Sequence, residues 1–483
     1  MPTRQDALTA AARWFDDGHL LAALRRRVAH RTESQRDGAL PDLRRYLSEE
    51  IGPSLAALGF AFRIVDNTVA GAGPFLLAER HEGDTLPTIL MYGHGDVVLG
   101  YDDQWRSGLS PWSLTVDGDR WYGRGTADNK GQHSINVAAL GQVLAARGHL
   151  GFNVKWLIET GEETGSPGLR AVCERERAAL AADVFIASDG PRLNAARPTL
   201  FLGSRGVFNF DLTVDLRDGG HHSGNWGGLL ANPGTILANA IATLVDARGR
   251  ILVDGLRPPP IPESIRRALA EVEPGEPTLQ GGSTGPQIDA DWGEPGLTPA
   301  ERVFAWNSLE VLAFKTGNPE HPVNAIPPRA VANLQLRFVV GCDDAGFIPA
   351  LRAHLDRNGF AKVGVAPSRM EVMHATRLDP DHPFVKRVAA SIAATTGRPP
   401  VVLPNLGGSL PNDCFADILG LPTVWVPHSY PACSQHAPNE HMLAPVAREG
   451  LAMMTGLFWD LGSPQLRGHE TQTKLQPQPS NTR

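Results

Sequence analysis

Apolar segments alternate with amphipathic segments through the first 200 residues of the chain. Three apolar runs that end in polar residues are predicted as buried strands: TLPTILMYGHGDVV (85–98), NVKWLIET (153–160) and DVFIASDG (183–190). The segments between them, 129–150 and 169–182, carry apolar residues at helical spacing. This βαβ order predicts an α/β fold with a mixed, mostly parallel sheet covered by helices.

The pattern changes after Pro198. Residues 201–217 and 330–341 alternate apolar and polar positions, which is typical of antiparallel strands with one solvated face. A helical segment, 232–250, lies between them. We therefore predict a smaller α+β domain that is inserted into the first domain; its role as a lid or dimerisation domain is what the family resemblance described below implies.

The first domain is predicted to resume with a helix at 382–397 and a buried strand at 421–427. Within the insertion, the Pro- and Gly-rich stretch 258–296 is predicted to be a surface excursion. The C-terminal tail is rich in Gln, Pro and Thr and is predicted to be disordered. The predicted division is a discontinuous catalytic domain at 1–203 and 374–462, an inserted domain at 204–373, and a tail at 463–483.

The composition and net charge of the chain indicate which kinds of molecule it can bind. Of 483 residues, 42% are hydrophobic and 20% are charged, and the net charge of −7 gives no basic footprint for nucleic acid. Small molecules or peptides fit better. The four cysteines form no CxxC pair, which argues against a disulfide framework or a thiolate zinc site and favours a reducing compartment. Because no apolar leader and no apolar run of about 18 residues occurs, we expect no membrane partner and a cytoplasmic location.

Polar clusters follow several of these strands. Each member has a simple alternative, because loop carboxylates are usually solvated, histidines usually form hydrogen bonds, and an Asp before a helix is usually a cap. Parallel strands end at one edge of a sheet, however, and imidazole and carboxylate groups that converge there can hold a pair of divalent cations. The clustered residues are His94, Asp96, Asp128, Glu162, Glu163, Asp189, His428 and His436.

Six motifs in this order carry a resemblance to a known family. They are GHGDVV, DGDRWYGRGTADNKG, EETGSPG, SDG, HHSGNWGG and HAPNE, spread from about Leu90 to Ala444. As an ordered set they resemble the M20 metallopeptidases, which include carnosine-type dipeptidases, aminoacylases, acetylornithine deacetylase and glutamate-releasing carboxypeptidases. HSGNWGG and the chain length are most similar to the carnosine-type dipeptidase branch.

The resemblance implies a site for two divalent metal ions. His94, Asp128 and Asp189 would hold one ion, and Asp128, Glu163 and His436 would hold the other, so that Asp128 bridges them. It also implies a cis peptide bond after Asp128. Two histidines with carboxylates suit zinc, and a carboxylate-rich site also tolerates manganese or cobalt.

Two further carboxylates are expected to act without binding metal. By the resemblance, Asp96 would support the metal site and orient the base. A divalent cation lowers the pKa of water bound to it towards about 7, so Glu162 can take a proton from that water as a general base. Glu162 would then return the proton to the departing nitrogen as a general acid.

The inserted domain is expected to contact the substrate. By the same resemblance, His222 would reach the substrate carbonyl from the partner subunit of a dimer, and the neighbouring His221 competes for this assignment. Arg337 can grip a carboxylate with two parallel hydrogen bonds, although an ion pair on a strand face is the alternative. The substrate-binding residues implied by the resemblance or by the turn GGSLPND are Asn324, Arg337, Gly408 and Ser409.

Three functions follow from these residues. The preferred one is a two-metal dipeptidase or related exopeptidase that hydrolyses an amide bond in a small peptide. The second is a deacylase or carbamoyl-amide hydrolase of N-acyl amino acids on the same scaffold. The third, an inactive binding protein, is disfavoured because every expected ligand and base position is filled. A homodimer, formed through the inserted domain, is also expected.

Overall fold

The computed structural model describes residues 2–274, 288–368 and 372–463. The predicted tail lies outside the described residues except for Ser463, and so do residues 275–287 of the predicted surface excursion. In the part of that excursion that is described, helix α10 (Glu263–Leu269) buries Ile265 and Leu269.

The chain divides into two compact units. Residues 201–203 and 374–381 group with the second unit, whereas the sequence placed them in the catalytic domain. The segment Leu403–Asp413 also groups with the second unit, against the same prediction. Hydrogen bonds explain this grouping, because Arg205 donates to the carbonyl of Gly407 and Ser204 donates to the carbonyl of Leu410. Within the described residues, the first unit is formed by residues 2–200, 382–402 and 414–463, and the second by residues 201–274, 288–368, 372–381 and 403–413.

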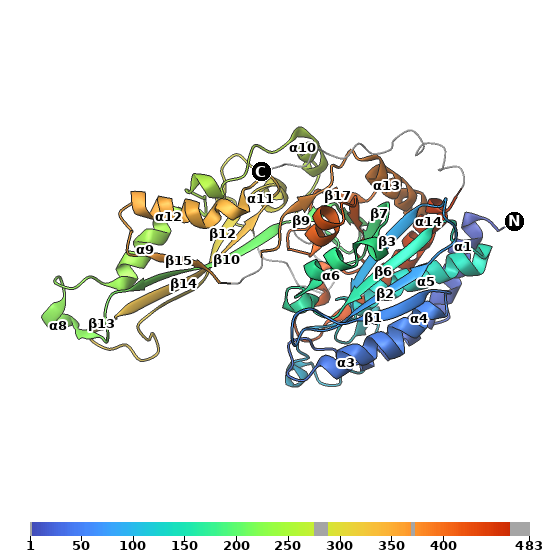
Figure 1. The fold of residues 1–483 in the computed structure, drawn as a ribbon, viewed down its shortest axis with the longest axis horizontal. Helices are drawn as coiled ribbons and strands as arrows, with labels where there is room; N and C mark the ends of the chain where they lie inside the picture. The colour runs from blue at the N-terminus through green and yellow to red at the C-terminus, as the bar shows by residue number, and fades with distance from the viewer. Residues whose placement is uncertain (1, 275–287, 369–371, 464–483) are drawn as a thin grey trace. The chain divides into compact units, whose positions relative to one another are not determined.

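An eight-stranded sheet forms the centre of the first unit (Figure 1). Its inner strands β6, β3, β7 and β18 are parallel, while β1 and β2 add antiparallel pairs at one edge. The strands, in spatial order, are β1 (Ala61–Val65), β2 (Phe75–Arg80), β6 (Asn153–Glu159), β3 (Thr88–His94), β7 (Val184–Ala187), β18 (Thr423–Trp425), β8 (Thr199–Phe201) and β17 (Val401–Leu403). The predicted mixed, mostly parallel α/β sheet is confirmed.

Helices pack around this sheet, and α5 is the most buried of the long ones. It packs against β3 and against α14, α1 and α2, and it is capped at its C-terminus by Gly148, whose φ of 79° lies in the left-handed region. The helices of this unit are α1 (Arg4–Asp16), α2 (His19–Ala29), α3 (Leu40–Arg45), α4 (Gly52–Ala56), α5 (Lys130–Arg147), α6 (Leu169–Arg175), α7 (Arg177–Leu180), α13 (Pro383–Thr396) and α14 (Ala444–Leu461). A small sheet adds β4 (Thr115–Asp117), β5 (Arg120–Tyr122) and β19 (His441–Leu443).

The second unit is a four-stranded antiparallel sheet with helices on one face (Figure 1). Alternate residues of β10 and β14 are buried, and they form one core with the apolar faces of α9 and α12. This confirms the predicted α+β character. The sheet order is β12 (Ser308–Thr316), β14 (Arg329–Phe338), β10 (Gly206–Asp215) and β15 (Gly364–Pro367). The other elements are β9 (Gly203–Ser204), β11 (His221–His222), α8 (Ser223–Trp226), α9 (Pro233–Leu244), α11 (Pro299–Phe304), β13 (Ala325–Ile326), α12 (Phe347–Arg357) and β16 (Thr376–Arg377).

Across the described ranges of both units, no helix combines the length and the apolar character that crossing a bilayer requires.

Candidate metal centre

The predicted ligands of the first unit lie where neighbouring strands end. β3 pairs in parallel with both β6 and β7, so the carboxyl ends of these strands lie next to one another. His94 is the last residue of β3, Glu163 lies in the short 3-10 turn after β6, and Asp189 follows β7. Asp128 lies just before α5. The parallel pairing therefore collects these side chains at one edge, as the strand pattern predicts.

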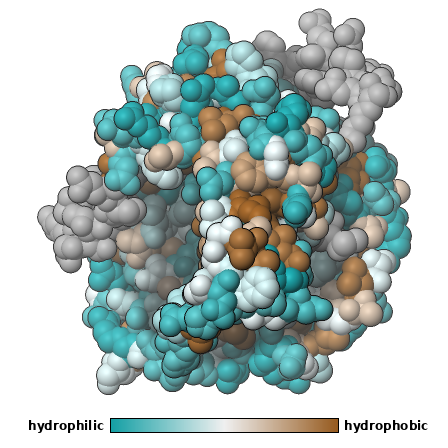
Figure 2. Space-filling view, turned by 90° about the vertical axis from the view of Figure 1, so that its left-hand side faces the viewer, coloured by the Kyte–Doolittle hydropathy of each residue, from teal (hydrophilic) through white to brown (hydrophobic). Residues whose placement is uncertain are grey.

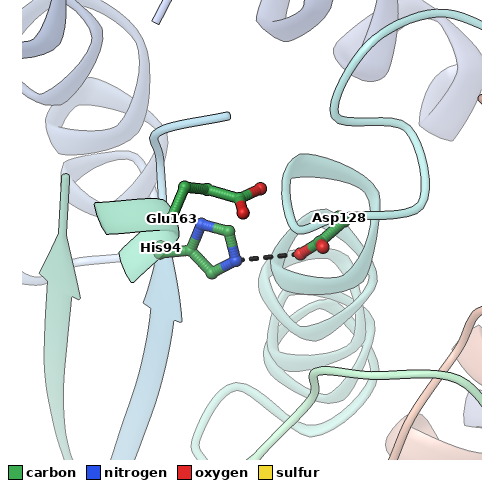
Figure 3. A group of neighbouring side chains, drawn as sticks. All are labelled: His94, Asp128 and Glu163. Atoms are coloured by element: carbon green, nitrogen blue, oxygen red, sulfur yellow. Dashed lines mark hydrogen bonds and ion pairs between the residues drawn. The ribbon is translucent and has the colours of Figure 1, made fainter. Parts of the chain in front are cut away.

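Three of these side chains point toward one another in Figure 3. One ligand atom from each of His94, Asp128 and Glu163 lies within 4.8 Å of the others. His94 Nε2 is 2.9 Å from Asp128 Oδ1. The peptide bond between Asp128 and Asn129 is cis, as the resemblance implied. Three segments that are distant in sequence thus supply one group of potential ligands.

His436 and Asp189 complete the group. His436 Nε2 is 2.9 Å from Asp128 Oδ2 and 3.1 Å from Glu163 Oε2. Asp189 Oδ2 is 3.6 Å from His94 Nε2. Asp128 therefore presents one oxygen to each histidine, which is the placement that a bridging carboxylate needs. The five predicted ligands lie together, and their role in binding metal stays a prediction.

The charges in this group perturb one another strongly. Burial, reinforced by the charge of Asp128, raises the pKa of Asp189 to about 6 and that of Glu163 to about 7. Burial acts in the same direction on Asp128, but hydrogen bonds with His436 and His94 outweigh it and lower the pKa of Asp128. Hydrogen bonds with Asp128 and Glu163 raise the pKa of His436 to about 11. Carboxylates this close together and this well buried need compensation by positive charge.

Two buried carboxylate oxygens in the group have no hydrogen-bond donor among the described residues. Glu163 Oε1 and Asp189 Oδ2 are buried and accept no hydrogen bond from any residue in the described part of the chain. Such oxygens are costly unless they are paired or bind a cation. Carboxylate oxygens and imidazole nitrogens are ligands for zinc and similar divalent ions. The residues present therefore fit divalent cations.

Asp96 and Glu162 lie beside the predicted ligands. Asp96 is buried, and its two oxygens accept the backbone N–H groups of Glu162 at 3.2 Å and Glu163 at 3.1 Å. Asp96 Oδ1 is also 3.3 Å from His94 Nδ1. Burial raises the pKa of Glu162 well above its usual range; His94 opposes this shift and Asp189 reinforces it. Asp96 is thus placed to support two segments, and Glu162 to hold a proton.

Three polar side chains of this centre were not predicted from the sequence. Gln435 donates a hydrogen bond to Asp128 Oδ2. Gln132 donates to two backbone carbonyls, 2.9 Å and 3.2 Å away, in the segments that carry Asp128 and Asp189. Glu440 accepts backbone N–H groups from the segment before α5. The signal available in the sequence was their nearness to predicted ligands, because all three lie within a few residues of Asp128 or His436.

His428, which the sequence placed in the same cluster, contacts a neighbouring side chain instead. Its Nε2 lies 3.1 Å from Ser188 Oγ. Burial, and then the charge of Arg192, hold the pKa of His428 well below its ordinary value. The ring is therefore neutral in the folded protein and helps to hold the segment that ends in Asp189.

His222 and Asn324 lie close together on the second unit. His222 is in β11, which pairs with β13, and Asn324 directly precedes β13. The His222 side chain is exposed, and its Nδ1 accepts the N–H of Gly224 at 3.1 Å. The carbonyl of Asn324 accepts the N–H of Ser223 at 2.9 Å. This short pairing fixes the backbone at both predicted substrate contacts.

Arg337 and Ser409 form a second polar group in the same unit. Arg337 Nη1 donates to Ser409 Oγ at 2.7 Å, and its Nε donates to Gln335 Oε1 at 3.0 Å. Ser409 Oγ donates in turn to the carbonyl of Arg205 at 2.7 Å. Within the described ranges Arg337 forms no ion pair, so the alternative considered from the sequence is not observed. The guanidinium keeps N–H groups free to bind an anion.

Arg205 is a member of this group that the sequence did not reveal. Burial, followed by the charge of Arg337, lowers the pKa of Arg205 to about 10, whereas Glu310 acts in the opposite direction. The partly buried Gly408 lies in the turn beside Ser409. Antiparallel pairing of Val207 with Arg337 explains why the two arginines are neighbours. Two adjacent guanidinium groups favour a negatively charged partner.

The family model described as "Peptidase family M20/M25/M40" matches residues 90–460, well over half of the chain. The chain belongs to this family. The resemblance drawn from the six motifs is therefore confirmed.

Curated members of the family with similar sequences include two dipeptidases. A β-Ala-His dipeptidase of Mus musculus is 29% identical over 315 residues, which cover 61% of this chain and 61% of that protein. A cysteinylglycine-S-conjugate dipeptidase of Corynebacterium striatum is 27% identical over 354 residues, covering 71% and 74% of the two chains. The match to the mouse enzyme thus spans about three fifths of its length.

A solved structure extends the similarity over nearly the whole chain. An M20 family metallo-carboxypeptidase of Sulfolobus solfataricus is 25% identical, with a TM-score of 0.76. The alignment covers 92% of this chain and 99% of that one. The aligned region therefore includes residues of both units.

Proposed function

We propose that this M20 family member is a metal-dependent dipeptidase. The observation that carries the proposal is the partly buried Glu162 carboxylate, which lies beside the His94, Asp128 and Glu163 group in a turn held by Asp96. The similarity to dipeptidases of Mus musculus and Corynebacterium striatum supports the choice of substrate class. Two divalent cations, with zinc preferred over manganese or cobalt, would be held by His94 with Asp189 and by His436 with Glu163, sharing Asp128.

The cations and the side chains would contribute different steps of the hydrolysis. When bound, the cations would polarise the amide carbonyl and make water a better nucleophile at neutral pH. Glu162 takes a proton from the attacking water and delivers it to the departing amine nitrogen. The raised pKa of Glu162 favours the second proton transfer, because a more basic carboxylate keeps the proton until it is transferred to the departing amine nitrogen. Asp96 positions Glu162 through its backbone N–H.

The substrate's terminal carboxylate is proposed to bind at Arg337. Its guanidinium is oriented by Ser409 and Gln335, and Arg205 adds a second positive charge beside it. A planar guanidinium matches a carboxylate with two parallel hydrogen bonds. A dipeptide ends in a free carboxylate, so it can supply the anion that Arg337 would bind.

A homodimer is proposed to complete the site with His222. Apolar side chains gather on one face of the molecule in Figure 2. Edge strand β12 exposes Val311, Leu312 and Phe314 at 43%, 59% and 42%. An exposed apolar edge strand can pair with another chain, and exposed apolar patches mark interaction sites. The exposed His222 would then contribute to the partner's site, so a His222→Ala subunit mixed with a Glu162→Ala subunit should regain part of the activity. No regain on mixing would contradict the shared site.

The main test is hydrolysis of a substrate panel. It contains several dipeptides, including β-alanyl-histidine, beside N-acetyl, N-succinyl and N-carbamoyl amino acids, assayed with added zinc, manganese or cobalt. Turnover of dipeptides that is lost in Glu162→Gln is the expected result. Turnover of the N-acyl substrates alone would assign the chain to the deacylases. Metal binding without any turnover would contradict the proposal. The cytoplasmic location stays a prediction from the sequence.

A further inference from the structure

Glu440 joins two segments of the metal centre that lie more than 300 residues apart in the chain. Its side chain is buried, and each carboxylate oxygen accepts two hydrogen bonds. One oxygen accepts the N–H groups of Ala127 at 2.9 Å and Asp128 at 3.0 Å. The other accepts Arg124 Nη1 at 2.8 Å and the N–H of Gly125 at 3.1 Å. All four contacts go to the segment that ends in the predicted bridging aspartate.

The segment before Glu440 carries His436 in an unfavourable backbone conformation. Ser434, His436 and Asn439 have φ values of 57°, 59° and 65°, in the left-handed region that side chains other than glycine rarely adopt. Three such residues within six positions persist only where surrounding contacts hold them. The backbone carbonyl of Glu440 accepts the N–H of Gly123 at 3.0 Å, so main chain and side chain both hold the end of this segment.

The four hydrogen bonds argue against Glu440 as a metal ligand. Its carboxylate is fully engaged by donors from the protein, unlike those of Glu163 and Asp189, which each keep an oxygen without a donor in the described ranges. A carboxylate saturated in this way is poorly suited to bind a cation. Its negative charge is matched by Arg124, which is itself buried.

We propose that Glu440 is a positioning residue that fixes the separation of Asp128 and His436, and thereby sets the affinity for the cation that these two would share. The inference rests on the proposed metal centre, but not on the identity of the substrate. Glu440 lies four residues after His436 and accepts the N–H of Asp128 itself, so it connects the two ligands by short and rigid paths.

Glu440→Gln tests the inference with little change of shape. Whichever way the amide is placed, its NH2 group faces two donors, either the N–H groups of Ala127 and Asp128 or those of Arg124 and Gly125. Zinc and cobalt are titrated into chelator-stripped protein by calorimetry, and the visible absorption of the cobalt form is recorded. We expect one of the two equivalents of metal to bind about 10- to 100-fold more weakly, with an altered cobalt spectrum. We also expect kcat to fall more than KM changes.

Glu82→Gln is the matched control. Glu82 also accepts two backbone N–H groups, from Leu150 at 2.8 Å and Gly151 at 2.7 Å, and pairs with Arg80 at 3.0 Å, but the loop it holds carries no predicted ligand. This variant should lose stability and keep the metal affinities and the cobalt spectrum of the wild type. If Glu440→Gln behaves in the same way, Glu440 only stabilises the fold and the inference is wrong.

Glu440→Asp covers the case in which the glutamine variant does not fold. It keeps the charge that Arg124 needs but shortens the reach to Asp128 by one methylene. Weakened binding of one equivalent in this folded variant supports the inference, and wild-type binding overturns it. The proposed function fails separately: a wild type that binds two cations yet cleaves no panel substrate refutes the dipeptidase while leaving this comparison intact. A wild type that binds no divalent cation refutes both.

Discussion

Replacing Arg337 by methionine should weaken recognition of the substrate carboxylate with little effect on the chemical step. Arg337 already uses Nε for Gln335 and one N–H of Nη1 for Ser409, so its remaining N–H groups can give a carboxylate two hydrogen bonds. Hydrogen bonds to charged groups contribute about 1.5–3 kcal/mol each, or about 3–6 kcal/mol for two. Since Arg337 is partly exposed, the lower end applies, and kcat/KM should fall about 100-fold.

The assay compares a dipeptide with its C-terminal amide, each with wild-type enzyme and with Arg337→Met. We expect the loss to appear mainly in KM and only with the free carboxylate, because this contact is equally strong in the ground state and the transition state. Arg329→Met is the control, since Arg329 lies on the same strand but is exposed. An equal loss with acid and amide would show that Arg337 supports the fold and does not bind the carboxylate.

Three further results are expected. Glu162→Gln should lower kcat by about 10²- to 10⁴-fold while the protein still binds metal, as measured by steady-state kinetics and calorimetry. Removal of the metal ions by a chelator should lower Tm, because the buried carboxylates lose the positive charge that compensates them. Zinc added back at about 100 times its Kd should raise the free energy of unfolding by about 2.7 kcal/mol. Because His428 has a lowered pKa when folded, its contribution is complete above the unfolded pKa of about 6.5 and is lost as the pH falls below it, with a slope of about 1.4 kcal/mol per pH unit. Other buried histidines, such as His133, also have lowered pKa values, so His428→Gln should reduce the slope in urea titrations without abolishing it; an unchanged slope would contradict the assignment.

The sequence was sufficient to predict the sheet and the positions of the chemical groups along it. Apolar runs that end in His94, Glu163 or Asp189 predict buried strands, and parallel pairing requires their carboxyl ends to meet. The grouping of residues 403–413 with the second unit was not predictable, because it depends on hydrogen bonds between Arg205 and Gly407, about 200 residues apart.

Supporting residues were harder to predict than ligands for a physical reason. A ligand is recognised by its type, since histidine and carboxylate bind divalent cations in any suitable fold. Gln132 and Glu440 act through backbone groups, which every residue carries, so their partners leave no mark in the sequence. Arg205 was missed for a related reason, because its proximity to Arg337 follows from the register of two antiparallel strands.

The distribution of hydrogen-bond donors separates two kinds of carboxylate at the metal centre. Asp96 and Glu440 receive backbone N–H groups on both oxygens, which offsets part of the cost of their burial, and burial still raises the pKa of Glu440. Glu163 and Asp189 differ because each keeps a buried oxygen without a donor in the described part of the chain. Protein donors at those oxygens would have lowered the pKa values and would also have competed with a metal ion. Asp96 and Glu440, whose oxygens accept backbone N–H groups, therefore hold the loops of the metal centre in place before any cation binds. Glu163 and Asp189, which each keep an oxygen without a donor in the described ranges, stay available as ligands.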